Sequence, residues 1–63
     1  MTKIEIYTGS ASAIKVGDMF IVKSHLYEVT DKAMNNTTVY ITGMDNEGLE
    51  RQFEFSHDTF FNY

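Results

Sequence analysis

The sequence predicts an all-β fold, a small antiparallel barrel of five strands that ends in a short helical or 3₁₀ turn. Runs of β-branched and aromatic residues recur at short intervals along the chain, and turn-forming residues separate them. The chain has 63 residues, of which 43% are hydrophobic. We therefore expect a single domain over residues 1–63 with one small core.

The amino-terminal part of the chain predicts one strand and a loop. Apolar and polar residues alternate over residues 2–8, which is the pattern of a half-buried strand. Residues 9–13 are small and show no period, so we expect a loop there. Ile14 and Val16 are expected to return toward the core before Gly17-Asp18 turns the chain.

The middle of the chain predicts a tight hairpin followed by a longer connection. Residues 19–23 and 26–30 are continuous β-prone runs, and only Ser24-His25 lies between them. Residues 31–36 read as a connection whose first half fits a single helical turn. Strand character then resumes over residues 37–44.

The last strand shows the cleanest alternation in the sequence. After a turn at residues 45–48, the odd-numbered residues of the segment 49–55 are mostly apolar and the even-numbered residues are polar. Residues 56–58 supply capping side chains ahead of 59–61, so we expect a short helical or 3₁₀ turn that closes the barrel. The aromatic residues in phase with the core are Phe20, Phe53, Phe55 and Phe60.

Four segments carry a resemblance to a known family: residues 15–22, 26–29 and 39–41, and Phe53. Their pattern, a Gly-Asp that opens a strand and a tight turn that leads to an aromatic-x-Val strand, resembles the amino-terminal SH3-like domain of the elongation factor P family. The resemblance implies an SH3-like barrel. The modified-lysine loop of that family has no counterpart here, so no translation-factor activity is implied.

Catalytic and metal chemistry find little support in the sequence. There is no cysteine, and the two histidines, His25 and His57, stand in a predicted turn and a capping segment. The spacing of the acidic residues and histidines matches no zinc or calcium loop, and the glycines form no phosphate-binding pattern. We expect no enzymatic activity, no cofactor, and no catalytic or metal-binding residue.

The chain shows no signal peptide and no apolar run long enough to cross a bilayer. We therefore expect a cytoplasmic protein. Its small size and acidity also resemble those of bacteriophage accessory proteins, which would place it in the cytoplasm of a host cell.

The acidic residues predict a protein-binding surface. The formal net charge is −4, and several acidic side chains fall on the outward faces or turns of the predicted strands. Such a surface can steer a basic or nucleic-acid-binding partner, and exposed tyrosines can anchor it. We predict a small regulator or inhibitor of another protein, with the contact residues Tyr7, Glu28, Tyr40, Glu47, Glu50 and Glu54.

Two other functions stay open at this point. A nucleic-acid-binding barrel would use Lys15, Lys23 and Arg51 around exposed Tyr27 and Tyr40, although the basic residues are few and scattered. A self-assembling component would instead pair an exposed sheet edge with a second copy of itself, giving a homo-oligomer.

Overall fold

Apart from one short 3₁₀ helix, all of the regular secondary structure in the described residues is β-strand, and the prediction of a small, barrel-like all-β fold is confirmed. The structure, a computed structural model, describes residues 5–62. Four strands form a curled antiparallel sheet in the order β2-β3-β4-β5, and two short strands, β1 and β6, pair separately. The elements are β1 (Gly9–Ser10), the 3₁₀ helix η1 (Ala11–Ala13), β2 (Met19–Val22), β3 (His25–Met34), β4 (Thr38–Met44), β5 (Glu50–Ser56) and β6 (Phe60–Phe61).

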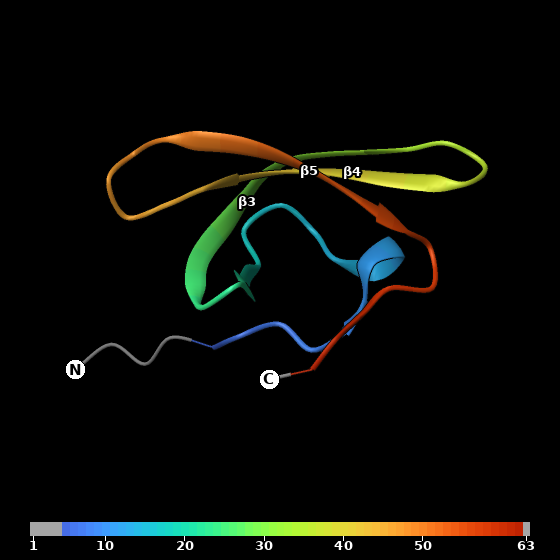
Figure 1. Cartoon of the computed structure of the whole chain (residues 1–63), viewed down its shortest axis with the longest axis horizontal. Coiled ribbons are helices and arrows are strands. Elements are labelled where there is room, and N and C mark those ends of the chain that lie inside the picture. Colours follow the sequence, from blue (N-terminus) through green and yellow to red (C-terminus); the bar gives the residue numbers. More distant parts are fainter. Residues whose placement is uncertain (1–4, 63) are drawn as a thin grey trace.

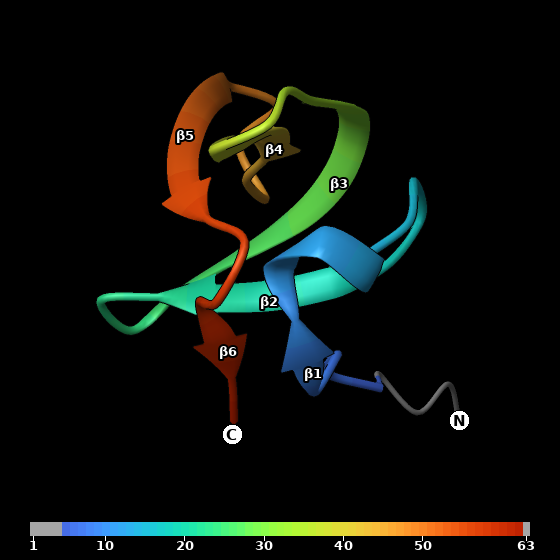
Figure 2. The same ribbon diagram turned by 90° about the vertical axis from the view of Figure 1, so that its right-hand side faces the viewer.

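The four-stranded sheet arches over the rest of the molecule. β3 is long and bends, so that its first half pairs with β2 in the lower layer and most of its length pairs with β4 in the upper layer (Figures 1 and 2). η1 and the β1-β6 pair lie beneath the arch (Figure 2). The sheet is therefore a half-barrel whose concave side holds the core.

A β-bulge helps to bend β3. Val29 lies opposite Gly43, but the next pair joins Asp31 to Thr42, so that Thr30 is an extra residue in β3. A bulge increases the local twist and moves the following residues to the opposite faces of the sheet. Beyond the bulge, Asp31 therefore lies on the convex side, and Lys32 turns inward, where its Nζ donates a hydrogen bond of 2.6 Å to the carbonyl oxygen of Ser12.

The core is a cluster of aromatic and branched side chains centred on Phe20. Phe20 is fully buried, and its ring centroid lies 5.7 Å from those of Tyr27 and Phe53 and 5.6 Å from that of Phe61. Phe55 packs edge-to-face on Phe61 at 5.1 Å. The buried residues are Ala11, Ile14, Phe20, Tyr27, Val29, Val39 and Ile41.

The turn predictions are confirmed closely. A two-residue loop, Lys23-Ser24, joins β2 to β3, so the hairpin lies one residue earlier than predicted. In the turn between β4 and β5, Oδ1 of Asp45 accepts hydrogen bonds from the backbone N–H groups of Glu47 and Leu49, at 2.9 and 3.0 Å. Gly48 in the same turn has a φ of 83°, which favours glycine.

The predictions for the chain ends are partly wrong. The 3₁₀ helix lies at Ala11–Ala13, where a loop was predicted, and the segment expected to be helical near the carboxyl terminus forms strand β6. Residues 2–4 of the predicted strand over residues 2–8 lie outside the described residues. Residues 5–8 form no strand, and only Ile6 makes an isolated parallel bridge, to Met19. The pairing of β1 with β6 explains the second difference, because a long-range contact overrides the local turn signal.

Three predictions of side-chain position or connection are also wrong. Phe60 is 66% exposed, and its neighbour Phe61 packs on the core in its place, because β6 is a strand and successive residues point to opposite sides. Val16 is 63% exposed, since it begins a turn and only Ile14 reaches the core. Residues 31–34 extend β3 and form no separate connection.

No helix among residues 5–62 is both long and apolar enough to cross a membrane.

Candidate functional site

The register of β3, β4 and β5 divides this part of the sheet into two faces of different chemistry. The concave face carries Phe53 and Phe55 of β5, which pair with Ile41 and Val39 of β4. The convex face carries the alternate residues, and it includes Thr42 and Tyr40 of β4. The residues of the convex face are Glu28, Thr30, Asp31 and Ala33 of β3, Thr38, Tyr40, Thr42 and Met44 of β4, and Glu50, Gln52, Glu54 and Ser56 of β5.

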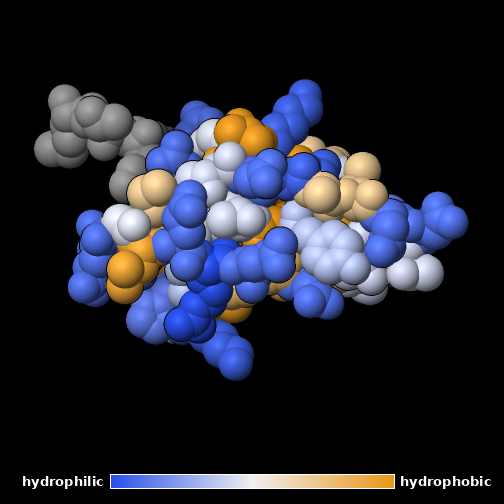
Figure 3. Space-filling view, turned by 90° about the horizontal axis from the view of Figure 1, so that it is seen from above, coloured by the Kyte–Doolittle hydropathy of each residue, from blue (hydrophilic) through white to orange (hydrophobic). Residues whose placement is uncertain are grey.

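Carboxylates gather on this convex face. Glu28, Asp31, Glu50 and Glu54 are all exposed. Seen from above the arch, the surface is mostly hydrophilic, with small hydrophobic spots between the polar side chains (Figure 3). We call the four carboxylates, with Tyr40 and Thr42 between them, the acidic face.

The geometry of the sheet sets the spacing of these charges. Neighbouring strands lie about 4.8 Å apart and residues along a strand about 3.3 Å apart, so Glu50 and Glu54 are separated by roughly 13 Å and Glu28 and Glu50 by roughly 10 Å. These separations are close to the screening length at physiological salt. The carboxylates therefore repel one another only weakly, and together they give this face a negative potential.

The basic residues of the described chain lie away from the acidic face. Lys15 and Lys23 are exposed in loops, Lys32 turns inward to Ser12, and Arg51 pairs with Gly43 on the concave side of β5. Within residues 5–62, no lysine or arginine projects from the convex side of the sheet to neutralise the carboxylates. Among the described residues, the carboxylates of the acidic face therefore have no basic neighbour, and they give this face a negative potential.

Two side-chain hydrogen bonds order parts of the acidic face. The hydroxyl of Thr30, the bulge residue, donates to Oε2 of Glu50 at 3.2 Å and approaches the carbonyl oxygen of Thr42 at 3.3 Å. Nδ2 of Asn35 donates to the hydroxyl of Tyr40 at 3.3 Å. Tyr40 also lies opposite Glu54 on β5 and Ala33 on β3, so its half-buried ring is an ordered centre of this face.

The structure brings together four of the six predicted contact residues. Glu28, Tyr40, Glu50 and Glu54 belong to the acidic face. Glu47 is exposed in the turn between β4 and β5, at one end of the sheet. Tyr7 lies in the lower layer, where its hydroxyl donates to the carbonyl oxygen of Ser10 at 2.8 Å and its ring contacts Phe61, so it stabilises the fold.

Sequence reasoning missed Asp31 as a member of the acidic face. The residue was assigned to a connection, whereas it continues β3 beyond the bulge. Without the bulge, Thr30 would lie opposite Thr42 and Asp31 would point into the core. Adjacent charges such as Asp31-Lys32 fall on opposite faces in any strand, so the sequence gives no local signal of which one points outward; that depends on the pairing of β3 with β4.

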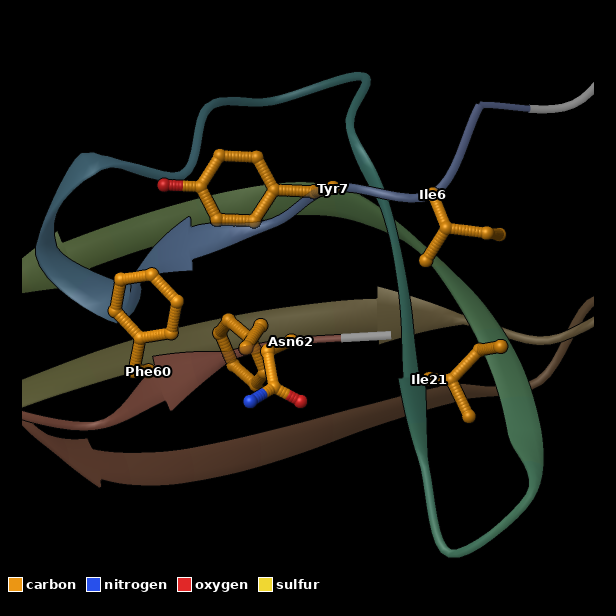
Figure 4. A pocket seen from close by; sticks show the side chains of 6 residues that line it. Ile6, Tyr7, Ile21, Phe60 and Asn62 are labelled. Atoms are coloured by element: carbon orange, nitrogen blue, oxygen red, sulfur yellow. The ribbon is translucent and has the colours of Figure 1, made fainter.

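A shallow apolar pocket of about 230 Å³ opens beside β6. In the close view, Ile6 and Ile21 lie together on one side, and the Tyr7 and Phe60 rings lie on the other, with Asn62 near them (Figure 4). Five of its six lining residues are aliphatic or aromatic, and they include the exposed ring of Phe60. It holds no charged side chain.

A second hollow, of about 410 Å³, lies between the β2-β3 and β4-β5 turns. Its walls mix charges of both signs with aromatic groups, and they include His25, Tyr27, Glu47 and Arg51. Asp45 also lines it, but one oxygen of this carboxylate accepts two backbone hydrogen bonds of its own turn. This mixture gives the hollow no single preference for a cation or an anion.

The residues of a nucleic-acid site do not come together. Tyr27 is only 7% exposed and packs in the core, while Tyr40 and Arg51 lie on opposite faces of the sheet. Lys15 and Lys23 stand in separate loops. A stacking platform flanked by cations, which single-strand binders use, is therefore not formed by these residues.

The histidines show no arrangement for catalysis or metal binding. Nε2 of His57 lies 2.7 Å from the carbonyl oxygen of Asn35, so this ring links the turn after β5 to the turn before β4. His25 lines the mixed-charge hollow. In the described part of the chain, no three His, Cys, Asp or Glu side chains are grouped as metal ligands.

Comparison with protein-family models, with curated proteins and with solved structures finds no match to this chain, so the resemblance to the elongation factor P family stays a prediction.

Proposed function

We propose that this protein is a small protein-binding module whose acidic face docks on a basic surface of a partner protein. The observation that carries the proposal is the segregation of charge across the sheet: exposed carboxylates share the convex side, and the described basic residues lie elsewhere. An interface of this kind gains association rate and specificity from complementary charge. Binding would block or regulate the surface that the partner presents.

Tyr40 is the proposed anchor of this interface. Tyrosine is enriched among the residues that dominate binding energy, because its ring supplies contact area and its hydroxyl a hydrogen bond. Here the ring is already ordered by its contacts in the sheet and by Asn35. Little side-chain entropy is lost when such a residue enters an interface.

The chemistry of the face defines the class of partner. A surface with several exposed carboxylates and one tyrosine fits a patch rich in lysine and arginine, as nucleic-acid-binding proteins present. The partner surface can be nearly flat, since the acidic face lies on the convex side of the sheet (Figure 2). An acidic face of this kind does not fit a nucleic acid, whose phosphates it would repel.

The test compares two charge-reversed baits of equal net charge. One carries Glu50→Lys and Glu54→Lys on the acidic face, and the other carries Glu5→Lys and Asp58→Lys, exposed positions outside that face. Each bait and the unchanged protein are immobilised, and the proteins retained from cell lysate with and without nuclease treatment are identified. The binding constant of the retained protein is then measured with all three.

The proposal predicts that the unchanged protein and the Glu5/Asp58 variant retain the same protein, and that the Glu50/Glu54 variant binds it at least about tenfold more weakly. Circular dichroism should show that both variants stay folded, because all four positions are exposed. Equal weakening by the two variants would mean that only overall charge matters and would overturn the assignment to this face. Loss of all retained protein on nuclease treatment would favour nucleic-acid binding.

A further inference from the structure

β5 is an edge strand with an open side. It is the last strand in the order β2-β3-β4-β5, and within residues 5–62 it pairs only with β4. Such an edge offers unpaired backbone N–H and C=O groups to another strand. Phe53 and Phe55 lie on the concave side of this strand and are only half-buried, so the apolar row continues to the edge.

We propose that the occupant of this edge is a second copy of the chain, whose β5 pairs antiparallel with the first β5 about a two-fold axis at Phe53. This inference goes beyond the proposed function and does not rest on it. The dimer would join the two four-stranded sheets into one continuous sheet. The charge pattern of β5 itself supplies the argument for this partner and this register.

Sheet geometry limits the registers that two copies can adopt. Residues directly opposite each other share a face, so inward, odd-numbered residues of one β5 meet odd-numbered residues of the other. In a pair with two-fold symmetry, the axis therefore passes midway between one residue and the same residue of the second copy. The candidates along β5 are Arg51, Gln52, Phe53, Glu54 and Phe55.

Charge selects one of these registers. An axis at Gln52 places Glu50 opposite Glu54, and axes at Arg51 or Glu54 place each of these residues opposite its own copy. Like charges directly opposite each other destabilise a sheet. An axis at Phe55 pairs only the last three residues of β5 with β5 of the second copy. The axis at Phe53 aligns all seven residues of β5 and opposes no like charges.

The side chains that meet in the Phe53 register are complementary. On the convex side, Glu54 faces Gln52 of the other copy, whose amide can donate to the carboxylate. On the concave side, Phe53 faces its own copy, and Arg51 faces Phe55, a pair that allows a cation–π contact. The half-buried side chains of Phe53 and Phe55 in each copy would therefore pack against side chains of the other copy.

The net charge gives this dimer a distinctive dependence on salt. Each copy carries a formal charge of −4, so two copies repel each other, and salt screens that repulsion. Self-association should therefore strengthen as sodium chloride rises. Binding of the acidic face to a basic partner should weaken over the same range of salt. The opposite responses to salt distinguish a failure of the dimer proposal from a failure of the proposed function.

The test places a charge opposite Glu54 of the second copy. Gln52 is exposed, so Gln52→Glu and Gln52→Lys should leave the fold intact. Because of the two-fold symmetry, the dimer contains two such pairs of residue 52 with Glu54, so each substitution alters both pairs. Sedimentation equilibrium of the full chain should show a dimer that is roughly threefold to tenfold weaker with Gln52→Glu and tighter with Gln52→Lys.

Ala33→Glu and Ala33→Lys are the matched controls. Ala33 is exposed on the same convex side, but it lies on β3, two strands away from the β5 edge. These variants should change the dimer constant far less than the Gln52 variants. The proposal is overturned if the unchanged chain stays monomeric up to about millimolar concentration in 0.5 M salt, or if the dimer responds to Ala33 as strongly as to Gln52.

Discussion

Gly43 controls how closely the core aromatics approach the middle of the sheet. A Cβ atom added at this position would lie 2.9 Å from Cβ of Tyr27 and 3.1 Å from the ring of Phe20. Both of these side chains are buried and packed, so neither can easily move away. The absence of a side chain at residue 43 is therefore what allows Phe20 and Tyr27 to pack on the backbone of β4.

We expect Gly43→Ala to lower the free energy of unfolding by about 1–3 kcal/mol, the usual cost of overpacking a core. Urea denaturation followed by circular dichroism measures it. Gln52→Ala, an exposed change on the neighbouring strand, should cost no more than about 0.5 kcal/mol. Equal stability of Gly43→Ala and the unchanged protein would show that the core is looser than described.

Phe60 and Phe61 offer a second test at the residue scale, because they are neighbours with opposite environments. Phe61 contacts Tyr7, Phe20 and Phe55, whereas Phe60 is 66% exposed. Phe61→Ala should lower the unfolding free energy by about 2 kcal/mol or more, and Phe60→Ala by about 0.5 kcal/mol or less. Thermal melts of the two variants give the comparison, and the reverse order would contradict the assignment of β6.

At the scale of elements, the β2-β3 hairpin has a turn that its residues suit poorly. Lys23 and Ser24 have φ values of 50° and 70°. A two-residue loop with positive φ at both positions is the type I′ turn, which strongly prefers Asn-Gly. Residues other than glycine, asparagine and aspartate are strained in this region of φ and ψ.

Replacing Lys23-Ser24 by Asn-Gly should therefore stabilise the protein by about 1 kcal/mol, which for a domain of this size raises the melting temperature by roughly 4–8 °C. Differential scanning calorimetry measures the shift. Swapping the order to Gly-Asn provides a control with the same composition and a smaller expected gain. No gain from Asn-Gly would show that the turn is not of type I′.

The elements also show what local sequence could and could not predict. The β4-β5 hairpin was predicted well, because Asp45 and Gly48 are turn residues and the alternation along 49–55 matches a strand with one buried face. The bulge at Thr30 was not predicted, since it depends on the register of β3 against β4. Asp31 was missed for the same reason, because only the bulge turns it toward the acidic face.

The chain ends show the other limit of local sequence. Ser56, His57 and Asp58 resemble capping residues, and the local pattern favoured a helical turn after them. The segment instead pairs with β1, far away in the chain, through Gly9↔Phe61 and Ser10↔Phe60. A pairing over such a distance leaves no local signal, so the exposed position of Phe60 could not be predicted from the residues around it.

At the scale of the whole molecule, the sheet separates charge from apolar surface, and this separation carries the functional proposal. The sequence of β5 alone shows acidic and apolar residues at alternate positions, and this alternation predicted the outward positions of Glu50 and Glu54. Glu28 was also predicted as a contact residue, the bulge in β3 adds Asp31, and the fold places Tyr7 and Glu47 outside this surface. The partner surface therefore depends on the whole fold.

Nuclear magnetic resonance can show whether the partner binds at the acidic face. The ¹⁵N-labelled protein would be titrated with the partner retained by affinity capture, and amide shift changes mapped along the chain. We expect shift changes concentrated at Glu28, Thr30, Asp31, Tyr40, Gln52 and Glu54, and we expect them to become smaller as salt rises. Changes concentrated instead around Ile6, Ile21 and Phe60, and insensitive to salt, would place binding at the apolar pocket and contradict the proposed function.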